Sequence, residues 1–344
     1  MTHSLTPIRE FTGLDDESIR REVLASGRPA VLRGLVAGWP AVARARESPA
    51  ALVSYLTGLD NGRPVDAIMI PPEAGRRIFY NAEMDGFNYL RNRLALSAVA
   101  EQVLRYAAFP HPPAVAAQSA LISDCMPGFL SDNRLTLLPE SVLPRIWLGN
   151  AVITPTHLDE WGNIACVISG RRRFTLFPPE QIGNLYVGPL DFAPTGAPLS
   201  LVELSAPDFQ RFPKFRSALA AAQGAELGPG DALFIPPLWW HNVESLEAVN
   251  VLVNYWWHAA EGVGDRRNSA FDCLFHGILS LRDLPPETRR AWGALFAHYV
   301  FGAQEEVTGH IPARRLGVLG RLSPQDASKL RSQLAKRLDP DILR

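Results

Sequence analysis

Cysteine is scarce in this sequence, which has three in 344 residues: Cys125, Cys166 and Cys273. An odd number of widely separated cysteines, with no CxxC pair, argues against a disulfide framework and against a zinc ribbon. We therefore expect a reduced, cytoplasmic setting. Residues 1–10 contain no apolar signal segment and no long apolar run occurs, so the chain is expected to be soluble and to lack a membrane span.

The sequence also lacks a surplus of charge of either sign. The chain has 34 Lys and Arg against 35 Asp and Glu, a formal net charge of −1. Nucleic-acid partners and acidic solvating tails both need a bias of charge, so neither is expected, although residues 171–173 are three adjacent arginines. With 47% hydrophobic and 20% charged residues, the composition is that of a globular protein. The length suits one large β domain with added helices, or two domains.

The first part of the chain mixes helix and strand patterns. Residues 15–26 place acidic residues before apolar ones at helical spacing, and residues 49–57 and 89–107 also predict helices. Residues 28–40 (RPAVLRGLVAGWP) predict a short strand followed by a glycine turn and a terminating proline, and residues 64–70 (PVDAIMI) predict another strand.

The middle of the chain predicts a β domain. From about residue 145 to 258, short apolar, β-branched and aromatic runs are separated by Gly and Pro. Short strands at regular spacing with turn signals indicate a sandwich or barrel. A strand pattern on each side of Ser169-Gly170 predicts a hairpin there.

The last part of the chain predicts helices over residues 268–281, 285–302 and 323–337. We therefore divide the chain into a barrel domain (1–260), with helical and strand additions at its N-terminus, and a helical region (261–344). An apolar stripe formed by Trp292, Leu295, Phe296 and Tyr299 exceeds what a free surface helix needs. It predicts either a cap packed on the barrel or a dimerisation element.

Three residues predict a metal site. His157 and Asp159 stand two apart in THLDEWGN (156–163), and His241 follows a strand pattern in LFIPPLWWHNVESL (233–246). On a strand, residues i and i+2 point to the same face, so an imidazole and a carboxylate would converge inside the barrel. Two histidines and one carboxylate make the facial triad of non-haem Fe(II) oxygenases, which leaves positions open for a co-substrate and dioxygen.

Other interpretations of these residues exist. An HxD pair arises by chance in many chains, with a surface histidine and a turn-forming aspartate. The strand patterns before both parts of the triad favour the metal site. Among the remaining histidines only His258, which closes a strand pattern, competes as third ligand.

Three blocks of the sequence resemble JmjC-type and cupin-like Fe(II)/2-oxoglutarate-dependent oxygenases: ITPTHLDEWGN, GRRRFTLFPP (170–179) and GDALFIPPLWWHNVESL (230–246). The resemblance spans roughly residues 28–258, and the subgroup it resembles most is the asparaginyl hydroxylase that inhibits hypoxia-inducible factor. It implies a mainly β fold with flanking helices, a double-stranded β-helix (jelly-roll or cupin barrel) followed by a helical segment.

The resemblance also implies roles for single residues. The triad matches the iron ligands of these enzymes. Residues of the 2-oxoglutarate pocket are matched by Thr154, Asn163 and Asn254. Where the subgroup has a lysine that pairs with the far carboxylate of 2-oxoglutarate, this sequence has Arg172. A guanidinium also forms a bidentate pair with a carboxylate, so we expect Arg172 to bind the co-substrate in a reshaped pocket.

Aromatic residues crowd the site in sequence, and most are expected to be core or pocket wall. Three residues are predicted to face the substrate: Trp161, Tyr80 and Trp240. Trp161 lies between the HxD pair and Asn163, and Tyr80 belongs to the N-terminal part, where this family often adds pocket residues.

The activity implied by the resemblance is hydroxylation of a C–H bond in a protein side chain or a small molecule, with succinate and carbon dioxide as co-products. A different cupin reaction at the same metal, such as an isomerase or a dioxygenase without a co-substrate, would leave Arg172 and Thr154 without a task. A non-catalytic metal- or ligand-binding cupin, acting as sensor or scaffold, is the other alternative, and the intact triad argues against it. Analogy with the subgroup predicts a homodimer through the C-terminal helices.

Overall fold

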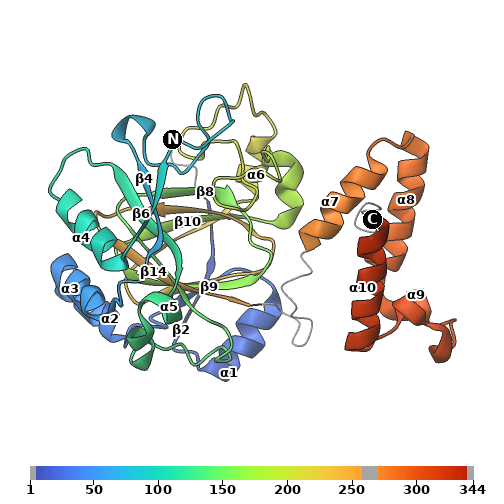
Figure 1. Ribbon diagram of the computed structural model, residues 1–344, viewed down its shortest axis with the longest axis horizontal. Helices are drawn as coiled ribbons and strands as arrows, with labels where there is room; N and C mark the ends of the chain where they lie inside the picture. The colour runs from blue at the N-terminus through green and yellow to red at the C-terminus, as the bar shows by residue number, and fades with distance from the viewer. Residues whose placement is uncertain (1–4, 258–269, 339–344) are drawn as a thin grey trace. The chain divides into compact units, whose positions relative to one another are not determined.

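The computed structural model describes residues 5–257 and 270–338 (Figure 1). The chain divides into two compact units, residues 1–264 and 265–344. Within the described ranges, all strands belong to the first unit. None of the described helices is long and apolar enough to cross a membrane.

Two β-sheets form the first unit. The smaller sheet contains, in spatial order, β1 (Thr6–Pro7), β11 (Gln223–Leu227), β10 (Arg172–Phe177), β13 (Trp240–Ser245) and β8 (Ile153–His157). The larger sheet contains, in spatial order, β2 (Arg9–Thr12), β3 (Ala30–Arg33), β12 (Ala232–Ile235), β9 (Gly162–Ser169), β14 (Asn250–Trp257), β7 (Arg145–Gly149), β6 (Ala114–Leu121), β4 (Val65–Ile70) and β5 (Leu90–Leu94). Strands β1 and β11, and β2 and β3, pair in parallel, and the other pairs are antiparallel.

Strand β9 of the larger sheet is buried on both faces. Along β9, Ile164, Cys166 and Ile168 belong to an apolar core shared with helices. The alternate residues Ala165 and Val167 belong to a second core, shared with the smaller sheet. Because successive side chains on a strand point to opposite faces, a continuous apolar run is needed where both faces are covered.

Helices α2 (Pro40–Glu47), α3 (Pro49–Leu59) and α4 (Leu96–Tyr106) cover the outer face of the larger sheet (Figure 1). Helix α3 begins where Ser48 accepts a hydrogen bond from the backbone N–H of Ala51 (3.0 Å) and Pro49 occupies the first helical position. The shorter helical segments of this unit are α1 (Asp16–Ser18), η1 (Ile19–Val23), η2 (Leu24–Ser26), η3 (Pro72–Ala74), α5 (Ile122–Cys125), η4 (Pro127–Ser131), η5 (Pro179–Asn184) and α6 (Phe215–Ala220). The predicted mainly β architecture with flanking helices is confirmed.

The second unit is helical in its described part. It contains α7 (Ala270–Leu281), α8 (Pro286–Tyr299), α9 (Gln304–Thr308), η6 (Ala313–Arg315), η7 (Gly317–Leu319) and α10 (Pro324–Leu338). Three members of the predicted apolar stripe, Trp292, Leu295 and Tyr299, are exposed. The predicted first two residues of α7, 268 and 269, lie outside the described residues.

Two local predictions were wrong and one helix was not predicted. The helix predicted over 89–107 starts at Leu96, because residues 90–94 pair with β4 as the edge strand β5. Helix α2, which starts at Pro40, was not predicted, whereas the strand and turn predicted over 28–40 are present. The hairpin at Ser169-Gly170 does not form, because β9 and β10 belong to different sheets.

The turn at Gly170 instead carries the chain from one sheet to the other. Gly170 has a φ of +73°, and a Cβ there would lie 2.8 Å from the carbonyl oxygen of Val249. Glycine is the residue that adopts this backbone without strain. The crossing matters for function because it places Arg172 in the sheet that holds both histidines.

Candidate metal centre

The two histidines come from paired strands of the smaller sheet. Strand β8 ends at His157, and His241 is the second residue of β13. His241 pairs directly with His157 across the antiparallel strands, which sets their side chains on one face. Their ring centroids lie 4.2 Å apart. The register shifts between His241 and Val243, a bulge of the kind that re-aims side chains beside active sites.

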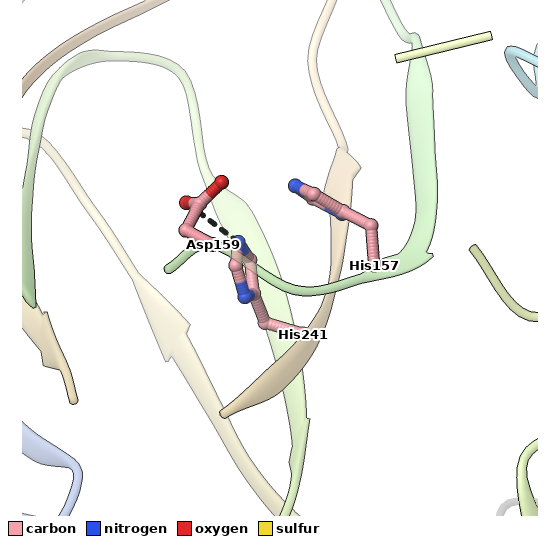
Figure 2. A group of neighbouring side chains, drawn as sticks. All are labelled: His157, Asp159 and His241. Atoms are coloured by element: carbon pink, nitrogen blue, oxygen red, sulfur yellow. Dashed lines mark ion pairs between the residues drawn. The ribbon is translucent and has the colours of Figure 1, made fainter. Parts of the chain in front are cut away.

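The Asp159 carboxylate lies in a loop. The prediction that Asp159 belongs to a strand was therefore wrong. Because β8 ends at His157, Asp159 lies in the turn that follows. The backbone N–H of Leu238 donates to the Asp159 carbonyl oxygen (2.8 Å), which ties this turn to the one before β13. Asp159 Oδ2 lies 3.6 Å from His241 Nε2, and Figure 2 shows the three side chains gathered together. Their donor atoms lie within 4.8 Å of one another.

Both imidazoles present the same nitrogen to this centre. His157 Nδ1 lies 2.8 Å from the Pro155 carbonyl oxygen, and His241 Nδ1 lies 3.0 Å from that of Trp239. A carbonyl oxygen only accepts hydrogen bonds, so each Nδ1 carries the proton and each Nε2 keeps a free lone pair. Metal-binding histidines are oriented in this way by their surroundings.

The histidine ring that is more deeply buried is neutral at physiological pH. Burial, and then the neighbouring His157, lower the pKa of His241 to about 4, and Asp159 opposes the shift. A metal ligand must be deprotonated at the coordinating nitrogen. The donor set therefore fits a divalent metal ion.

A chain of hydrogen bonds holds the Asp159 carboxylate. Asp159 Oδ2 accepts from Trp256 Nε1 (2.9 Å) and from Asn163 Nδ2 (3.4 Å). Asn254 Nδ2 donates to Asn163 Oδ1 (3.2 Å), and Trp147 Nε1 donates to Asn254 Oδ1 (2.8 Å). These bonds fix the orientation of the two side-chain amides. The last donors in the series bond to the Asp159 carboxylate.

The triad opens into a cavity of about 110 Å³ lined by residues from both sheets. One water needs roughly 10–15 Å³ of such volume. The cavity therefore has room for a small organic molecule beside the triad.

Arg172, the first residue of β10, lines this cavity. Its side chain is buried, its Nε has no hydrogen-bond partner, and no carboxylate of the described residues forms an ion pair with it. Burial lowers the pKa of Arg172 to about 10. Its neighbours Arg171 and Arg173 instead reach Glu226 at the surface. A buried cation without a counter-ion is unfavourable, so the cavity suits an anion.

All four residues predicted to bind the co-substrate lie along this cavity: Thr154 on β8, Asn163 on β9, Arg172 on β10 and Asn254 on β14. They come from strands far apart in sequence and converge because the two sheets face each other. Their roles toward a co-substrate stay predictions.

The three residues predicted to face the substrate are not among the described residues that line the cavity. Trp240 is fully buried, because the alternation that turns His241 toward the centre turns its neighbour away. Tyr80 donates its hydroxyl to the Phe192 carbonyl oxygen (2.7 Å). Trp161 packs edge-on against Trp256. His258, the rival third ligand, lies outside the described residues.

Several residues that line the cavity were not predicted individually, among them Gln118, Thr195 and Ala197, and Trp147 and Trp256 line it as well. The two tryptophans were assigned only to core or pocket wall, although a buried indole N–H needs an acceptor. Gln118 stands out as a long polar residue in the apolar run AVAAQSAL. Thr195 and Ala197 belong to an irregular loop, and no pattern could have identified them.

Comparison with known proteins places the chain in a family. Residues 16–262 match the family described as Cupin-like domain. Human HSPB1-associated protein 1 is 36% identical over 149 residues, which are 43% of this chain and 30% of that protein. Lysine-specific demethylase JMJ31 of Arabidopsis thaliana is 36% identical over 134 residues, 39% of this chain and 23% of that protein. Lysine-specific demethylase 8 of Xenopus tropicalis is 25% identical over 248 residues, 70% of this chain and 50% of that protein.

The chain thus spans no more than half the length of these three relatives. The family match includes the triad and every residue named above as lining the cavity. This chain belongs to the cupin-like domain family.

Proposed function

We propose that this protein is an Fe(II)- and 2-oxoglutarate-dependent oxygenase that hydroxylates a C–H bond of a protein side chain or a small molecule. The observation that carries the proposal is Arg172, a buried and unpaired guanidinium in the same cavity as a two-histidine, one-carboxylate triad. A metal site alone would also serve other cupin reactions, but those reactions do not require the buried Arg172 cation.

Fe(II) would be held by His157 Nε2, His241 Nε2 and the Asp159 carboxylate. This ligand set is typical of non-haem Fe(II) oxygenases and leaves coordination positions open. When bound, the iron supplies dioxygen activation coupled to oxidative decarboxylation of 2-oxoglutarate to succinate and carbon dioxide.

Arg172 and Thr154 would bind and orient the co-substrate, and two asparagines would support the metal ligand. The Arg172 guanidinium would form a bidentate pair with its far carboxylate, and the Thr154 hydroxyl would donate to the same group. Asn163 and Asn254 keep the Asp159 carboxylate in place through their hydrogen bonds. Apolar lining residues such as Phe174 exclude water from the site.

A protein side chain is the substrate class that the comparisons favour. Two relatives are named as lysine-specific demethylases, and a third is named for its association with the protein HSPB1. The resemblance to an asparaginyl hydroxylase supports the same class. All of these substrates and partners are proposals for this chain, because it covers no more than half of each of the three relatives.

The test measures succinate formation from 2-oxoglutarate by anaerobically purified, Fe(II)-loaded protein after air is admitted. Many such enzymes turn over slowly without their substrate, so we expect succinate from the wild-type protein and none from His157→Ala. His310→Ala, a change at an exposed histidine of the second unit, is the matched control and should behave as the wild type.

The proposal is wrong if the iron-loaded wild-type protein forms no succinate and also shows no 2-oxoglutarate binding by calorimetry. That result would favour a non-catalytic, metal- or ligand-binding cupin.

A further inference from the structure

Strand β6 is irregular where it passes the cavity. Ala117 pairs with Leu148 of β7, but Ala120 pairs with Ile146, so Gln118 and Ser119 together lie opposite the single residue Trp147. Ser119 has a φ of +49°, a left-handed conformation that non-glycine residues adopt at a cost. Bulges and strained residues of this kind gather at functional sites.

The surrounding structure holds this strained segment in place. Arg145 Nη1 donates to the Ser119 carbonyl oxygen (2.8 Å). The same guanidinium lies 6.0 Å from the ring centroid of Trp256, the residue that donates to Asp159. One arginine thus connects the bulge with the residues that orient the metal ligand.

The bulge presents an uncommitted amide to the cavity. Gln118 lines the cavity, and its side chain makes no hydrogen bond to any described residue. The two other lining amides, Asn163 and Asn254, already bond to each other and to Asp159 and Trp147. Gln118 is therefore the lining amide that is left to bond a bound molecule.

The charges around the cavity restrict what that molecule can be. In a site loaded as proposed above, the charges of Fe(II) and Arg172 balance those of Asp159 and a 2-oxoglutarate dianion. The described lining holds no further Asp or Glu. A substrate cation would have no counter-ion there, and burial of an unpaired charge is unfavourable.

We infer that Gln118 is a substrate-positioning residue, which orients a neutral, hydrogen-bonding side chain of a peptide substrate and disfavours a cationic one. An amide both donates and accepts, so it can orient an amide or hydroxyl group. This inference rests on the proposed oxygenase function, but a different measurement tests it.

The experiment measures binding of three peptides to the Fe(II)- and 2-oxoglutarate-loaded protein under anaerobic conditions, where no turnover occurs. The peptides differ only at their central residue, which is glutamine, serine or lysine. Fluorescence anisotropy gives the peptide Kd, and calorimetry gives the 2-oxoglutarate Kd for each protein. The variants are Gln118→Ala and Gln118→Glu, with Gln210→Ala, at an exposed glutamine, as matched control.

We expect the wild-type protein to bind the glutamine or serine peptide more tightly than the lysine peptide. Gln118→Ala should weaken that binding about two- to tenfold, the value of one hydrogen bond, with the 2-oxoglutarate Kd unchanged. Gln118→Glu adds a counter-ion and should shift the preference toward lysine.

The inference is overturned if the lysine peptide binds best to the wild-type protein, if neither neutral peptide binds, or if Gln118→Ala binds all three peptides as the wild type does. If the wild-type protein does not bind 2-oxoglutarate, the proposed function is contradicted instead. Failure of the inference and failure of the proposed function are therefore distinguishable.

Discussion

Replacing Arg172 by methionine should stabilise the protein in the absence of 2-oxoglutarate and remove most of its response to 2-oxoglutarate. The guanidinium is buried, its Nε lacks a hydrogen-bond partner, and burial lowers its pKa well below the ordinary value, to about 10. At about 1.4 kcal/mol for each pH unit, holding this group charged in the folded state costs roughly 3 kcal/mol.

The size of this penalty depends on pH. Arg172 is a base with a lowered pKa in the folded protein, so the penalty is fully present at neutral pH, below the folded pKa. It fades only as the pH rises toward the pKa of the unfolded chain. Methionine is unbranched and fills most of the same space, so we expect Arg172→Met to raise the free energy of unfolding by about 1–3 kcal/mol at neutral pH.

The co-substrate should stabilise the wild-type protein much more than Arg172→Met. A ligand at a hundred times its Kd stabilises the protein that binds it by about 2.7 kcal/mol. Loss of one partner of a buried charge pair costs roughly 2–5 kcal/mol of binding, so the same concentration should stabilise Arg172→Met by less than about 1 kcal/mol. Urea unfolding of the Mn(II)-loaded protein, with and without 2-oxoglutarate, measures both effects.

Arg173→Met is the matched control for this prediction. Arg173 is the next residue on the strand, but its side chain is 51% exposed and pairs with Glu244 and Glu226. Its loss should change the free energy of unfolding by less than about 1 kcal/mol and leave the response to 2-oxoglutarate intact. The reasoning is refuted if Arg172→Met unfolds at lower urea than the wild type without ligand, or if it keeps the wild-type response to 2-oxoglutarate.

Three further predictions concern the surroundings of the site. Trp256→Phe removes the indole donor to Asp159 (2.9 Å) and should weaken Mn(II) binding about 10- to 100-fold in a competition titration; an unchanged Kd would show that this bond does not orient the ligand. Gly170→Ala, at φ +73° with a Cβ 2.8 Å from the Val249 carbonyl oxygen, should destabilise the protein by roughly 2–4 kcal/mol in thermal unfolding, and a smaller loss would mean that the turn relaxes. Deletion of residues 265–344, the second compact unit, should leave Mn(II) affinity unchanged. Sedimentation should show that the deletion converts the predicted homodimer to a monomer. A monomeric full-length protein would contradict the prediction of a dimerisation element.

The fold class could be predicted because the signals are local. The continuous apolar run of β9 is needed by a strand covered on both faces, and it is visible in the sequence alone. The helices of the second unit carry their own spacing of apolar residues. Where tertiary pairing decided the outcome, the predictions failed, since residues 90–94 have a mixed pattern and become a strand only by pairing with β4.

The candidate site, too, could be predicted from the sequence only in part. The HxD pair and the later histidine could be identified from residue types and spacing, and the resemblance pointed to Arg172. The sequence could not show that Asp159 lies in a turn beyond the strand, because that depends on the bond from Leu238, which is distant in the chain. The same holds for the bonds that join Trp147, Asn254 and Asn163 to Asp159.

By itself, then, the sequence determined the types of chemical group in the site and the kinds of secondary structure, because both follow from local composition and periodicity. The tertiary structure decided which of those groups face the cavity. Trp240 is turned into the core while its neighbour His241 faces the metal centre, and Gln118 reaches the cavity beside a bulge set by the register of β6 against β7. Register and sheet assignment depend on contacts between distant segments, and no local pattern encodes them.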